Sequence, residues 1–279
     1  MINFNGTVTK SKELSINNRG YRYGDALFET IKVIGTNILF WEDHYFRLMA
    51  SMRILRMEIP MTFTMEYLEK QILETVSANG LDTATSRVRL LVHREEGGLY
   101  RPETNSIGFI IVVEALESSH YLMNEGPYLV DLFKDYYVSA DLLSNLKTNN
   151  KILNVVGSIY AKDNDFDNCL ILNTSKNVVE ALNGNIFSLK GNIIKTPPLT
   201  DGCLKGIMRK QVIDIIRTMP ELNLLEESIS PFELQKADEL FITNVIQGIQ
   251  PVTQYRKKNF GIDLSRSLLS KLNIKIRLD

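Results

Sequence analysis

Two long runs of β-branched residues constrain the fold of this chain most strongly, because such runs form extended strands. Residues 86–95 read SRVRLLVHRE, with two Val and two Leu, and residues 107–116 read IGFIIVVEAL, with three Ile and two Val. A short strand at 37–40 and a helix at 42–57, with apolar residues at helical spacing, precede them. The first part of the chain therefore predicts a mixed α and β domain.

Helix ends are marked by residue type. Pro60 should close the helix at 42–57, because proline cannot continue a helix. Thr64 is a typical N-cap, and Gly80 is a typical C-terminal stop. A second helix is therefore predicted between these two residues.

A second region of strands and helices follows a polar interruption. Residues 118–127, SSHYLMNEGP, gather the Ser, Asn, Gly and Pro that are typical of linkers. We therefore expect an α/β (mixed α+β) fold of two domains, 1–117 and 128–279, with this linker between them. The second domain begins with YLVDLFKDYYV, at 128–138. The elements expected in it are hairpins that turn near TSKN and KGN, a helix opened by Gly206 and ended by Pro220, and a strand at 239–243 that leads into a loop.

Bulk properties exclude several classes of function. The formal net charge is -1, so no global field favours nucleic acid or an anionic membrane. No apolar run has transmembrane length, and the N-terminus lacks the apolar core of a secretory signal. Cys169 and Cys203 do not make a disulfide framework, and His44, His93 and His120 lack the spacing of metal ligands. We expect a cytoplasmic protein without a metal.

The stretch NLKTNNKILN, residues 145–154, is unusual. Four asparagines and a threonine surround Lys147 and Lys151 just before an apolar, helix-like run. A lysine in a polar loop is most often simply solvated. A chemical role for either lysine therefore depends on the residues found elsewhere in the chain.

Other candidate residues also have ordinary explanations. Glu180, at the end of the strand NVVE, is either a surface residue of a hairpin edge or a carboxylate buried with a partner. Gly206 opens a helix whose first N–H groups could bind an anion, but it also suits a tight turn. Thr243 and Asn244 end a strand where turn chemistry is equally expected, and Arg47 could be a solvated helix residue.

Taken together, these residues match the needs of pyridoxal 5'-phosphate (PLP). The cofactor requires a lysine for its aldehyde, a carboxylate for its ring nitrogen and a cradle for its phosphate. A helix start, an arginine and hydroxyl groups are suitable parts of such a cradle.

Six segments in order resemble the class IV aminotransferase family, the fold-type IV PLP enzymes, and they extend over nearly the whole chain. The matching segments are NRGYRYGDALFETIKV (18–33), EDHYFRLMASMRIL (42–55), NLKTNN (145–150), VVEALNGNIF (178–187), TPPLTDGCLKGIMR (196–209) and LFITNVIQGIQPV (240–252). The resemblance implies a two-domain, D-amino acid aminotransferase-like fold and a homodimer.

The family pattern LKxxN selects Lys147, with Asn150 as its asparagine, as the Schiff-base lysine. Lys151 lies beyond the pattern and is expected to be structural. The resemblance makes Glu180 the partner of the ring nitrogen. It places the phosphate contacts on Arg47, on the amides of Ile207 and Met208, and on Thr243 or Asn244. The family's hydroxyl would fall one residue beyond Asn244, at Val245.

The resemblance leaves the reaction open. The chain lacks the Arg-x-His pair of D-amino acid aminotransferases and the Gly-Gly-Asn-Tyr stretch of branched-chain aminotransferases. LKTNN, FITN and Thr30, which matches a substrate-side threonine, resemble 4-amino-4-deoxychorismate lyases, although threonine is also common in strands. We therefore expect a lyase that releases pyruvate and 4-aminobenzoate for folate precursor synthesis. The alternatives are an aminotransferase of branched-chain or other amino acids and a non-catalytic binding protein.

Overall fold

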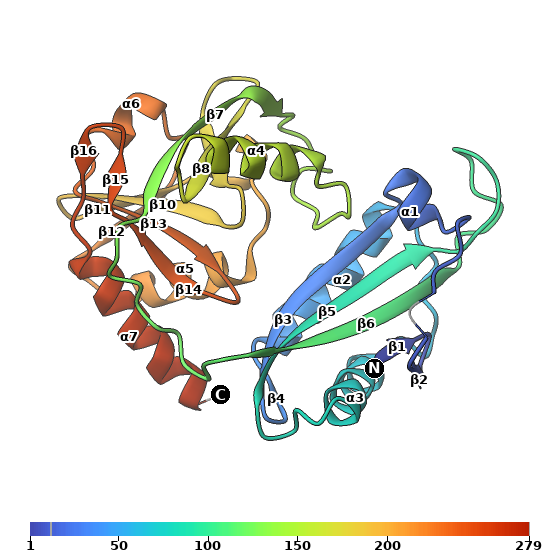
Figure 1. Ribbon diagram of the computed structural model, residues 1–279. Coiled ribbons are helices and arrows are strands. Elements are labelled where there is room, and N and C mark those ends of the chain that lie inside the picture. Colours follow the sequence, from blue (N-terminus) through green and yellow to red (C-terminus); the bar gives the residue numbers. More distant parts are fainter. Residues whose placement is uncertain (12, 279) are drawn as a thin grey trace. The chain divides into compact units, whose positions relative to one another are not determined.

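The computed structural model describes residues 1–11 and 13–278 and divides the chain into two units (Figure 1). Unit 1 contains Met1–Ser119 and the short segment Lys147–Asn150, and unit 2 contains His120–Leu146 and Lys151–Asp279. The division after Ser119 falls inside the expected linker. The segment around Lys147 differs from the expectation, because it was placed in the C-terminal domain and the structure groups it with unit 1.

Unit 1 is built on one antiparallel sheet in the order β2-β1-β6-β5-β3-β4. β5 and β6 are the two long β-branched runs, and they pair over their whole length. The strands of this sheet are β1 (Ile2–Phe4), β2 (Thr7–Thr9), β3 (Ala26–Ile34), β4 (Asn37–Ile38), β5 (Thr85–Arg94) and β6 (Ile107–Leu116).

Two helices of 14 residues each pack on this sheet, α2 (Trp41–Ile54) against β3 and α3 (Met65–Ala78) against β1 and β6. A short helix, α1 (Arg19–Tyr23), precedes β3. The α3 start is as expected, because the Thr64 side chain accepts a hydrogen bond from the Tyr67 N–H. The α2 helix ends earlier than expected, since Arg56 adopts a positive φ of 56° that breaks the helix before Met57.

Unit 2 contains two five-stranded sheets, in the orders β12-β11-β10-β13-β14 and β16-β15-β7-β8-β9. The expected hairpins are present as the antiparallel pairs β8–β9 and β10–β11. The strands are β7 (Leu129–Val138), β8 (Asn168–Asn173), β9 (Val178–Ala181), β10 (Asn185–Lys190), β11 (Ile193–Thr196), β12 (Asn223–Glu226), β13 (Glu239–Asn244), β14 (Gly248–Val252), β15 (Gln254–Tyr255) and β16 (Lys258–Asn259).

The expected loop after β13 is instead a second strand. β14 pairs with β13 from Asn244↔Gly248 to Leu240↔Val252. Pro251 does not prevent this pairing, because β14 is an edge strand and proline is tolerated there.

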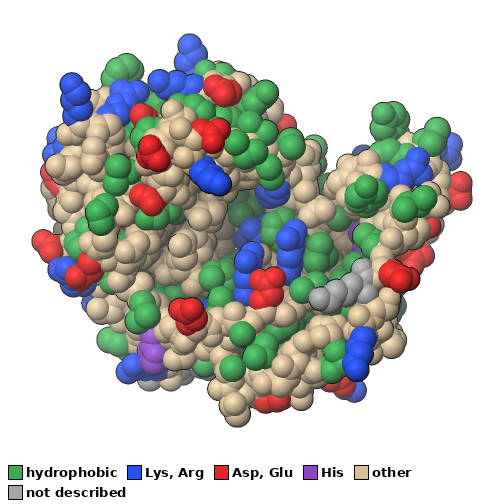
Figure 2. All heavy atoms as spheres, in the orientation of Figure 1, with side chains coloured by type: hydrophobic (Ala, Val, Ile, Leu, Met, Phe, Trp, Pro, Cys, Tyr) green, Lys and Arg blue, Asp and Glu red, His purple; other side chains and the backbone are tan. Residues whose placement is uncertain are grey.

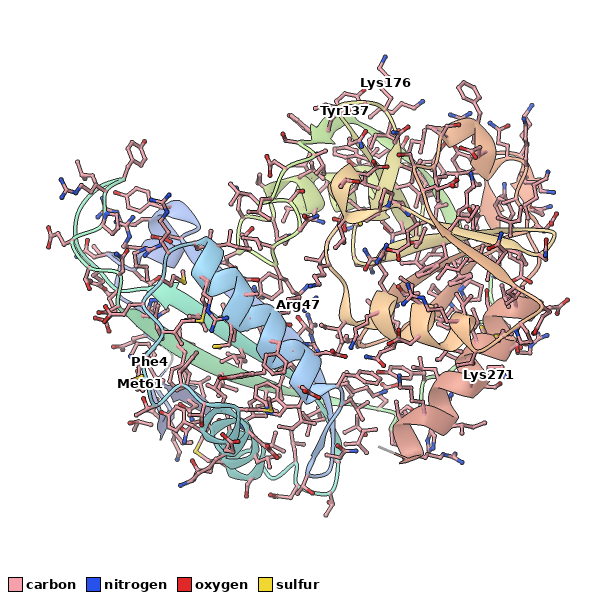
Figure 3. All side chains as sticks on the ribbon, turned by 180° about the vertical axis from the view of Figure 1, so that it is seen from behind. Phe4, Arg47, Met61, Tyr137, Lys176 and Lys271 are labelled. Atoms are coloured by element: carbon pink, nitrogen blue, oxygen red, sulfur yellow. The ribbon has the colours of Figure 1, made fainter. Side chains whose placement is uncertain are left out.

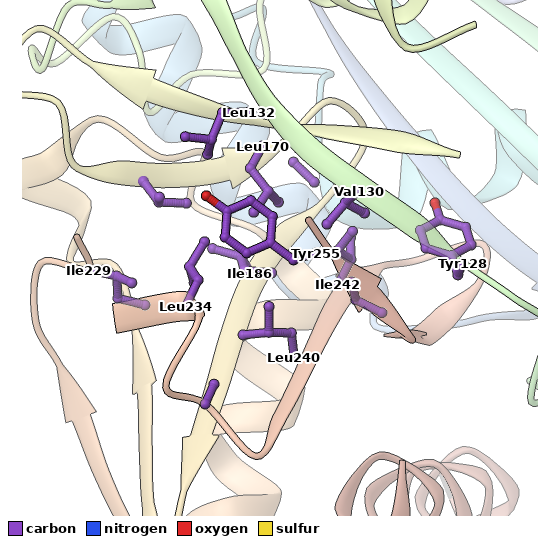
Figure 4. Packing of buried hydrophobic residues seen from close by; sticks show 14 of the residues in the cluster. Tyr128, Val130, Leu132, Leu170, Ile186, Ile229, Leu234, Leu240, Ile242 and Tyr255 are labelled. Atoms are coloured by element: carbon purple, nitrogen blue, oxygen red, sulfur yellow. The ribbon is translucent and has the colours of Figure 1, made fainter. Parts of the chain in front are cut away.

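The core of unit 2 lies between the inner faces of its two sheets (Figure 4). Tyr255 is fully buried in the middle of this cluster, where Leu132, Leu170 and Ile186 lie around its ring. Because apolar residues from both sheets share one core, the sheets form one rigid support for the loops at their ends.

Helices complete unit 2. Gly206 is the N-cap of α5 (Ile207–Arg217), as expected, and Lys151 is the N-cap of α4 (Ile152–Asp163). The remaining helical segments are η1 (Leu199–Asp201), α6 (Pro231–Leu234) and α7 (Asp263–Leu278). Within the described residues, no helix has the length and apolar character that a membrane span requires. Figure 2 shows acidic and basic side chains interspersed on the visible face, in keeping with the small net charge.

Candidate active site

Residues Lys147–Asn150 are held along β3 by backbone hydrogen bonds. The Phe28 N–H donates to the Lys147 carbonyl at 2.9 Å, and the Asn149 N–H donates to the Ala26 carbonyl at 2.9 Å. An isolated bridge between Leu27 and Thr148 lies between these two bonds. Lys147 is therefore fixed by a strand-like contact with β3, although the motif reads as a loop in the sequence.

The side chains of Lys147 and Arg89 both lie over the Phe28 ring. The Lys147 Nζ atom lies 4.5 Å from the centre of the Phe28 ring, and the Arg89 Cζ atom lies 4.4 Å from the same centre. Arg89 also donates from Nη2 to the Asn149 Oδ1 at 3.1 Å. Two positively charged side chains beside one ring make this face of the sheet attractive to an anion.

The same face of the sheet carries further polar groups. Thr30 is directly opposite Arg89 in the β3–β5 register, and Lys32 follows Thr30 on the same face because side chains alternate along a strand. Burial lowers the pKa of Lys32 to about 8. Burial, followed by the charge of Arg87, lowers the pKa of Arg89. The Arg89 Nε atom is buried and has no hydrogen-bond partner among the described residues.

The opposite face of β3 carries a buried charged cluster with α2, on which Arg47 lies (Figure 3). Arg47 donates from Nε to the Glu29 Oε1 at 2.8 Å and from Nη2 to the Glu29 Oε2. The His44 Nδ1 lies 2.7 Å from the same Glu29 Oε2. Burial alone would raise the pKa of Glu29, but the charge of Arg47 and the hydrogen bond from His44 lower it to about 2. Arg47 is therefore not a solvated helix residue.

In unit 2, Glu180 is located at the edge of a sheet but is not fully solvated. It lies on β9, opposite Ile171 of β8, and is partly buried. Its Oε2 accepts a hydrogen bond from the Leu204 N–H at 2.8 Å. The carboxylate is thereby tied to the loop that leads into α5.

The start of α5 provides backbone N–H groups without a side-chain cap. Gly206 makes no side-chain cap hydrogen bond, and the first N–H groups of an α-helix lack partners inside the helix. A Cβ atom on Gly206 would lie 1.9 Å from the Asn185 Oδ1, so only glycine fits here. The Asn185 Nδ2 donates to the Leu204 carbonyl at 2.9 Å, which fixes the loop before the helix.

The Thr243 hydroxyl is a further candidate group for binding a ligand. Thr243 pairs directly with Asn185 in the β10–β13 ladder. Its Oγ1 atom is buried and has no hydrogen-bond partner among the residues that the structure describes. Asn185 thus pairs with Thr243 and closely approaches Gly206. An uncapped helix start and an unsatisfied hydroxyl together suit an anion with several oxygens.

The Asn244 side chain belongs to the β13–β14 turn. Its Oδ1 accepts hydrogen bonds from the Ile246 and Gln247 N–H groups at 3.1 and 2.9 Å. The neighbouring Val245 carbonyl accepts from the Tyr121 hydroxyl at 2.9 Å. Of the alternatives in this segment, Thr243 is therefore better suited than Asn244 to contact a ligand through its side chain.

Sequence reasoning missed Glu29, His44, Lys32 and Arg89. A signal for Glu29 was present, because Leu27, Glu29, Ile31 and Val33 alternate on the face of β3 that is buried, and a carboxylate there requires partners. No comparable signal marks Arg89, because Arg and Lys in a strand sequence are usually interpreted as residues of a solvent-exposed face.

Comparisons with known proteins agree with this fold and motif order. The sequence pattern described as "Amino-transferase class IV" matches residues 26–255. A Methanocaldococcus jannaschii protein described as a "Putative branched-chain-amino-acid aminotransferase" is 30% identical over 253 residues, which cover 90% of this chain and 86% of that protein.

Two solved structures share the fold. A branched-chain aminotransferase from Thermoproteus uzoniensis, solved with norvaline, has a TM-score of 0.87 at 23% identity and covers 97% of this chain and 92% of that chain. A 4-amino-4-deoxychorismate lyase from Pseudomonas aeruginosa has a TM-score of 0.84 at 25% identity and covers 98% of both chains. The described fold is thus the mixed α/β architecture of the fold-type IV enzymes, as the sequence predicts. This chain belongs to the class IV aminotransferase family, whose enzymes depend on PLP.

Proposed function

We propose that this chain is a PLP-dependent aminotransferase that acts on branched-chain or other apolar amino acids. The observation that carries the proposal is the similarity, over nearly the whole chain, to the M. jannaschii protein assigned to that activity. This reverses the order of the two activities expected from the motifs, where the lyase came first.

The residues of unit 2 fit the cofactor's phosphate and ring nitrogen. The N–H groups of Ile207 and Met208 at the uncapped α5 start suit a phosphate dianion, and the buried Thr243 hydroxyl supplies a further donor. We propose Glu180 as the partner of the ring nitrogen, because its carboxylate is held in place by the Leu204 N–H. Asn244 is assigned to the turn rather than to the ligand.

The residues of unit 1 fit the covalent and substrate-binding roles. When bound, PLP supplies a ring that withdraws electrons from the reacting carbon of an amino acid. Lys147 holds the cofactor through Nζ and moves a proton at the substrate's α-carbon, and Phe28 fixes the position of Nζ. Arg89 binds the substrate's carboxylate, because its Nε has no other partner among the described residues. For Arg47, we propose the role that the family resemblance implies, which is to bind the phosphate of the cofactor.

A 4-amino-4-deoxychorismate lyase is the second candidate, and Thr30 is the observation that favours it. Thr30 lies opposite Arg89 on the sheet face that carries Phe28, so a hydroxyl is available near the proposed substrate groups. The lyase would release pyruvate and leave an aromatic amine, 4-aminobenzoate. Both reactions begin with proton removal by Lys147, so the sequence motifs that they share do not separate them.

We further propose that the protein is a homodimer. Three large apolar side chains of unit 1, Tyr21, Leu99 and Tyr100, are mostly exposed in the single chain. Aromatic residues are enriched where subunits meet, so a second copy would cover them. Sedimentation at micromolar concentration tests this proposal, and an active monomer would contradict it.

The activity is tested with purified protein and two substrates in parallel. We expect leucine plus 2-oxoglutarate to give glutamate, and 4-amino-4-deoxychorismate to give no pyruvate. Pyruvate release without glutamate formation would favour the lyase instead. Colourless protein after addition of PLP, with neither product, would identify a non-catalytic binding protein.

A further inference from the structure

We propose that Glu29 and His44 are positioning residues that fix the guanidinium of Arg47, and that they thereby set the affinity for the cofactor's phosphate without contacting it. This inference rests on the proposed function, because it takes Arg47 as a phosphate-binding group. Neither residue was singled out by the sequence motifs.

The geometry holds the guanidinium from one edge. Glu29 accepts from both Nε and Nη2 of Arg47, which fixes the plane of the group as well as its position. His44 then holds the carboxylate through its Oε2 at 2.7 Å. All three side chains are at least nine-tenths buried. Arginine has many rotamers, so a preformed orientation removes an entropy cost that phosphate binding would otherwise meet.

The protonation state of the cluster follows from its contacts. An ionised carboxylate only accepts hydrogen bonds, so the His44 Nδ1 must carry the proton that it shares with Glu29. The His44 Nε2 is buried without a hydrogen-bond partner among the described residues, which suits a neutral ring. Burial lowers the pKa of His44, and the charges of Arg47 and Lys147 lower it further, while Glu29 acts in the opposite direction. His44 therefore orients Glu29 as a neutral donor.

A purely structural role does not explain this arrangement well. Replacing a buried ion pair by apolar residues is often neutral or stabilising, so stability alone is a weak reason for burying Arg47 and Glu29. A fixed direction for the guanidinium is what the pair provides beyond stability. The two explanations predict different effects on ligands that differ only in a phosphate.

The test compares the affinities of pyridoxamine 5'-phosphate and pyridoxamine, which differ only in the phosphate and form no bond with Lys147. Both are titrated by fluorescence into the full chain purified without cofactor. His44→Leu should weaken pyridoxamine 5'-phosphate about five- to twentyfold, as expected for one charge-assisted contact, and should leave pyridoxamine unchanged. His44→Asn should restore affinity to within about twofold of wild type, because its amide can replace the Nδ1 donor.

Two further variants complete the design. Glu29→Gln keeps the side-chain shape and provides a second test if His44→Leu does not fold, since it should weaken the phosphorylated ligand selectively. Arg47→Ala is the reference, and adding His44→Leu to it should cause no further loss. Arg53, an exposed arginine of the same helix, gives the matched control Arg53→Ala, which should change neither affinity.

The outcomes separate the inference from the proposed function. The positioning role is overturned if Arg47→Ala shows a selective loss but His44→Leu and Glu29→Gln both keep wild-type affinity. It is also overturned if Arg47→Ala shows a selective loss but these two variants lose affinity equally for the two ligands. If Arg47→Ala itself shows no selective loss, Arg47 is not the phosphate group and the inference fails with that assignment. If the wild type binds neither ligand, the proposed function fails too.

Discussion

The Nζ atom of Lys147 lies 4.5 Å from the centre of the Phe28 ring, and the backbone of Lys147 accepts a hydrogen bond from the Phe28 N–H of β3. Lys151, four residues later, instead occupies the N-cap of α4. The same polar stretch therefore places its two lysines in different structural settings, and only Lys147 is fixed against a strand of unit 1.

Lys147→Ala should abolish turnover and the visible absorbance of the bound cofactor. The reason is that the family pattern and the strand-like backbone contact both select this lysine. Lys151→Ala is the matched control and should keep both properties. Absorbance spectra and product assays of the two variants, with PLP added, show which of the two lysines holds the cofactor. Retained cofactor absorbance in Lys147→Ala would show that another lysine holds PLP.

Glu180→Gln should keep cofactor binding and lose most of the turnover. The amide oxygen can still accept from the Leu204 N–H, so the loop should remain in place. The negative charge that favours a protonated ring nitrogen is lost, and the ring becomes a weaker electron acceptor. Steady-state rates at saturating PLP test this expectation, with Glu221→Ala, an exposed glutamate of unit 2, as control. Near-normal turnover would remove Glu180 from the mechanism.

Thr243→Val should raise the stability of the cofactor-free protein and reduce the extra stability that PLP binding provides. Without PLP, the substitution removes a buried hydroxyl that has no partner among the described residues, so the free energy of unfolding should rise by about 1 kcal/mol. With PLP, the variant lacks a phosphate donor, so the stabilisation by ligand should be smaller than in wild type. Thermal melts with and without PLP measure both. Equal stabilisation by PLP in both proteins would show that the hydroxyl does not contact the cofactor.

The depressed pKa of Lys32 predicts a pH-dependent stability. Its pKa is about 8 in the folded chain and near its ordinary value of 10.5 when unfolded, so between these values the unfolded chain binds more protons. The free energy of unfolding of wild type should therefore rise relative to Lys32→Met as the pH increases from about 8 to about 10.5. Urea unfolding of both proteins across this range measures the difference. A constant difference would mean that the pKa of Lys32 is the same in the folded and the unfolded chain.

Local signals in the sequence predicted much of this fold but not the position of Lys147. The Thr64 cap, the helix start at Gly206 and the β8–β9 hairpin each depend on neighbouring residues, so they can be inferred from short patterns. The pairing of Thr148 with Leu27 joins residues far apart in the chain, and no local pattern predicts it. The motifs identified Arg47, but its partner Glu29 could be recognised only from the strand alternation.

Two further residues differ from the expectation, Asn244 for a local reason and Arg89 for a long-range one. Asn244 was named as a ligand contact because its residue type fits both a turn and a phosphate loop, and its hydrogen bonds to Ile246 and Gln247 assign its side chain to the turn. Arg89 could be recognised as a candidate site residue only from the structure, which places it over the Phe28 ring that Lys147 also contacts. Convergence of distant side chains is a property of the tertiary structure.

Thr30→Val separates the two candidate reactions. The substitution keeps the β-branched shape and removes only the hydroxyl, so the melting temperature and cofactor spectrum should barely change. For an aminotransferase of apolar amino acids, the hydroxyl has no polar group of the substrate side chain to bind. We therefore expect transamination of leucine to stay within about twofold of wild type, which corresponds to less than ~0.5 kcal/mol in the barrier.

A lyase would respond differently to Thr30→Val, because a hydrogen bond from the hydroxyl to the substrate could strengthen in the transition state. Its pyruvate release should then fall about ten- to a hundredfold, a loss of roughly 1.4–2.8 kcal/mol in transition-state stabilisation. Rates measured with leucine plus 2-oxoglutarate and with 4-amino-4-deoxychorismate, on wild type and variant together, distinguish the cases. A wild type that releases pyruvate, and a variant that loses this activity selectively, would replace the aminotransferase proposal by the lyase and would make Thr30 a substrate-contacting residue.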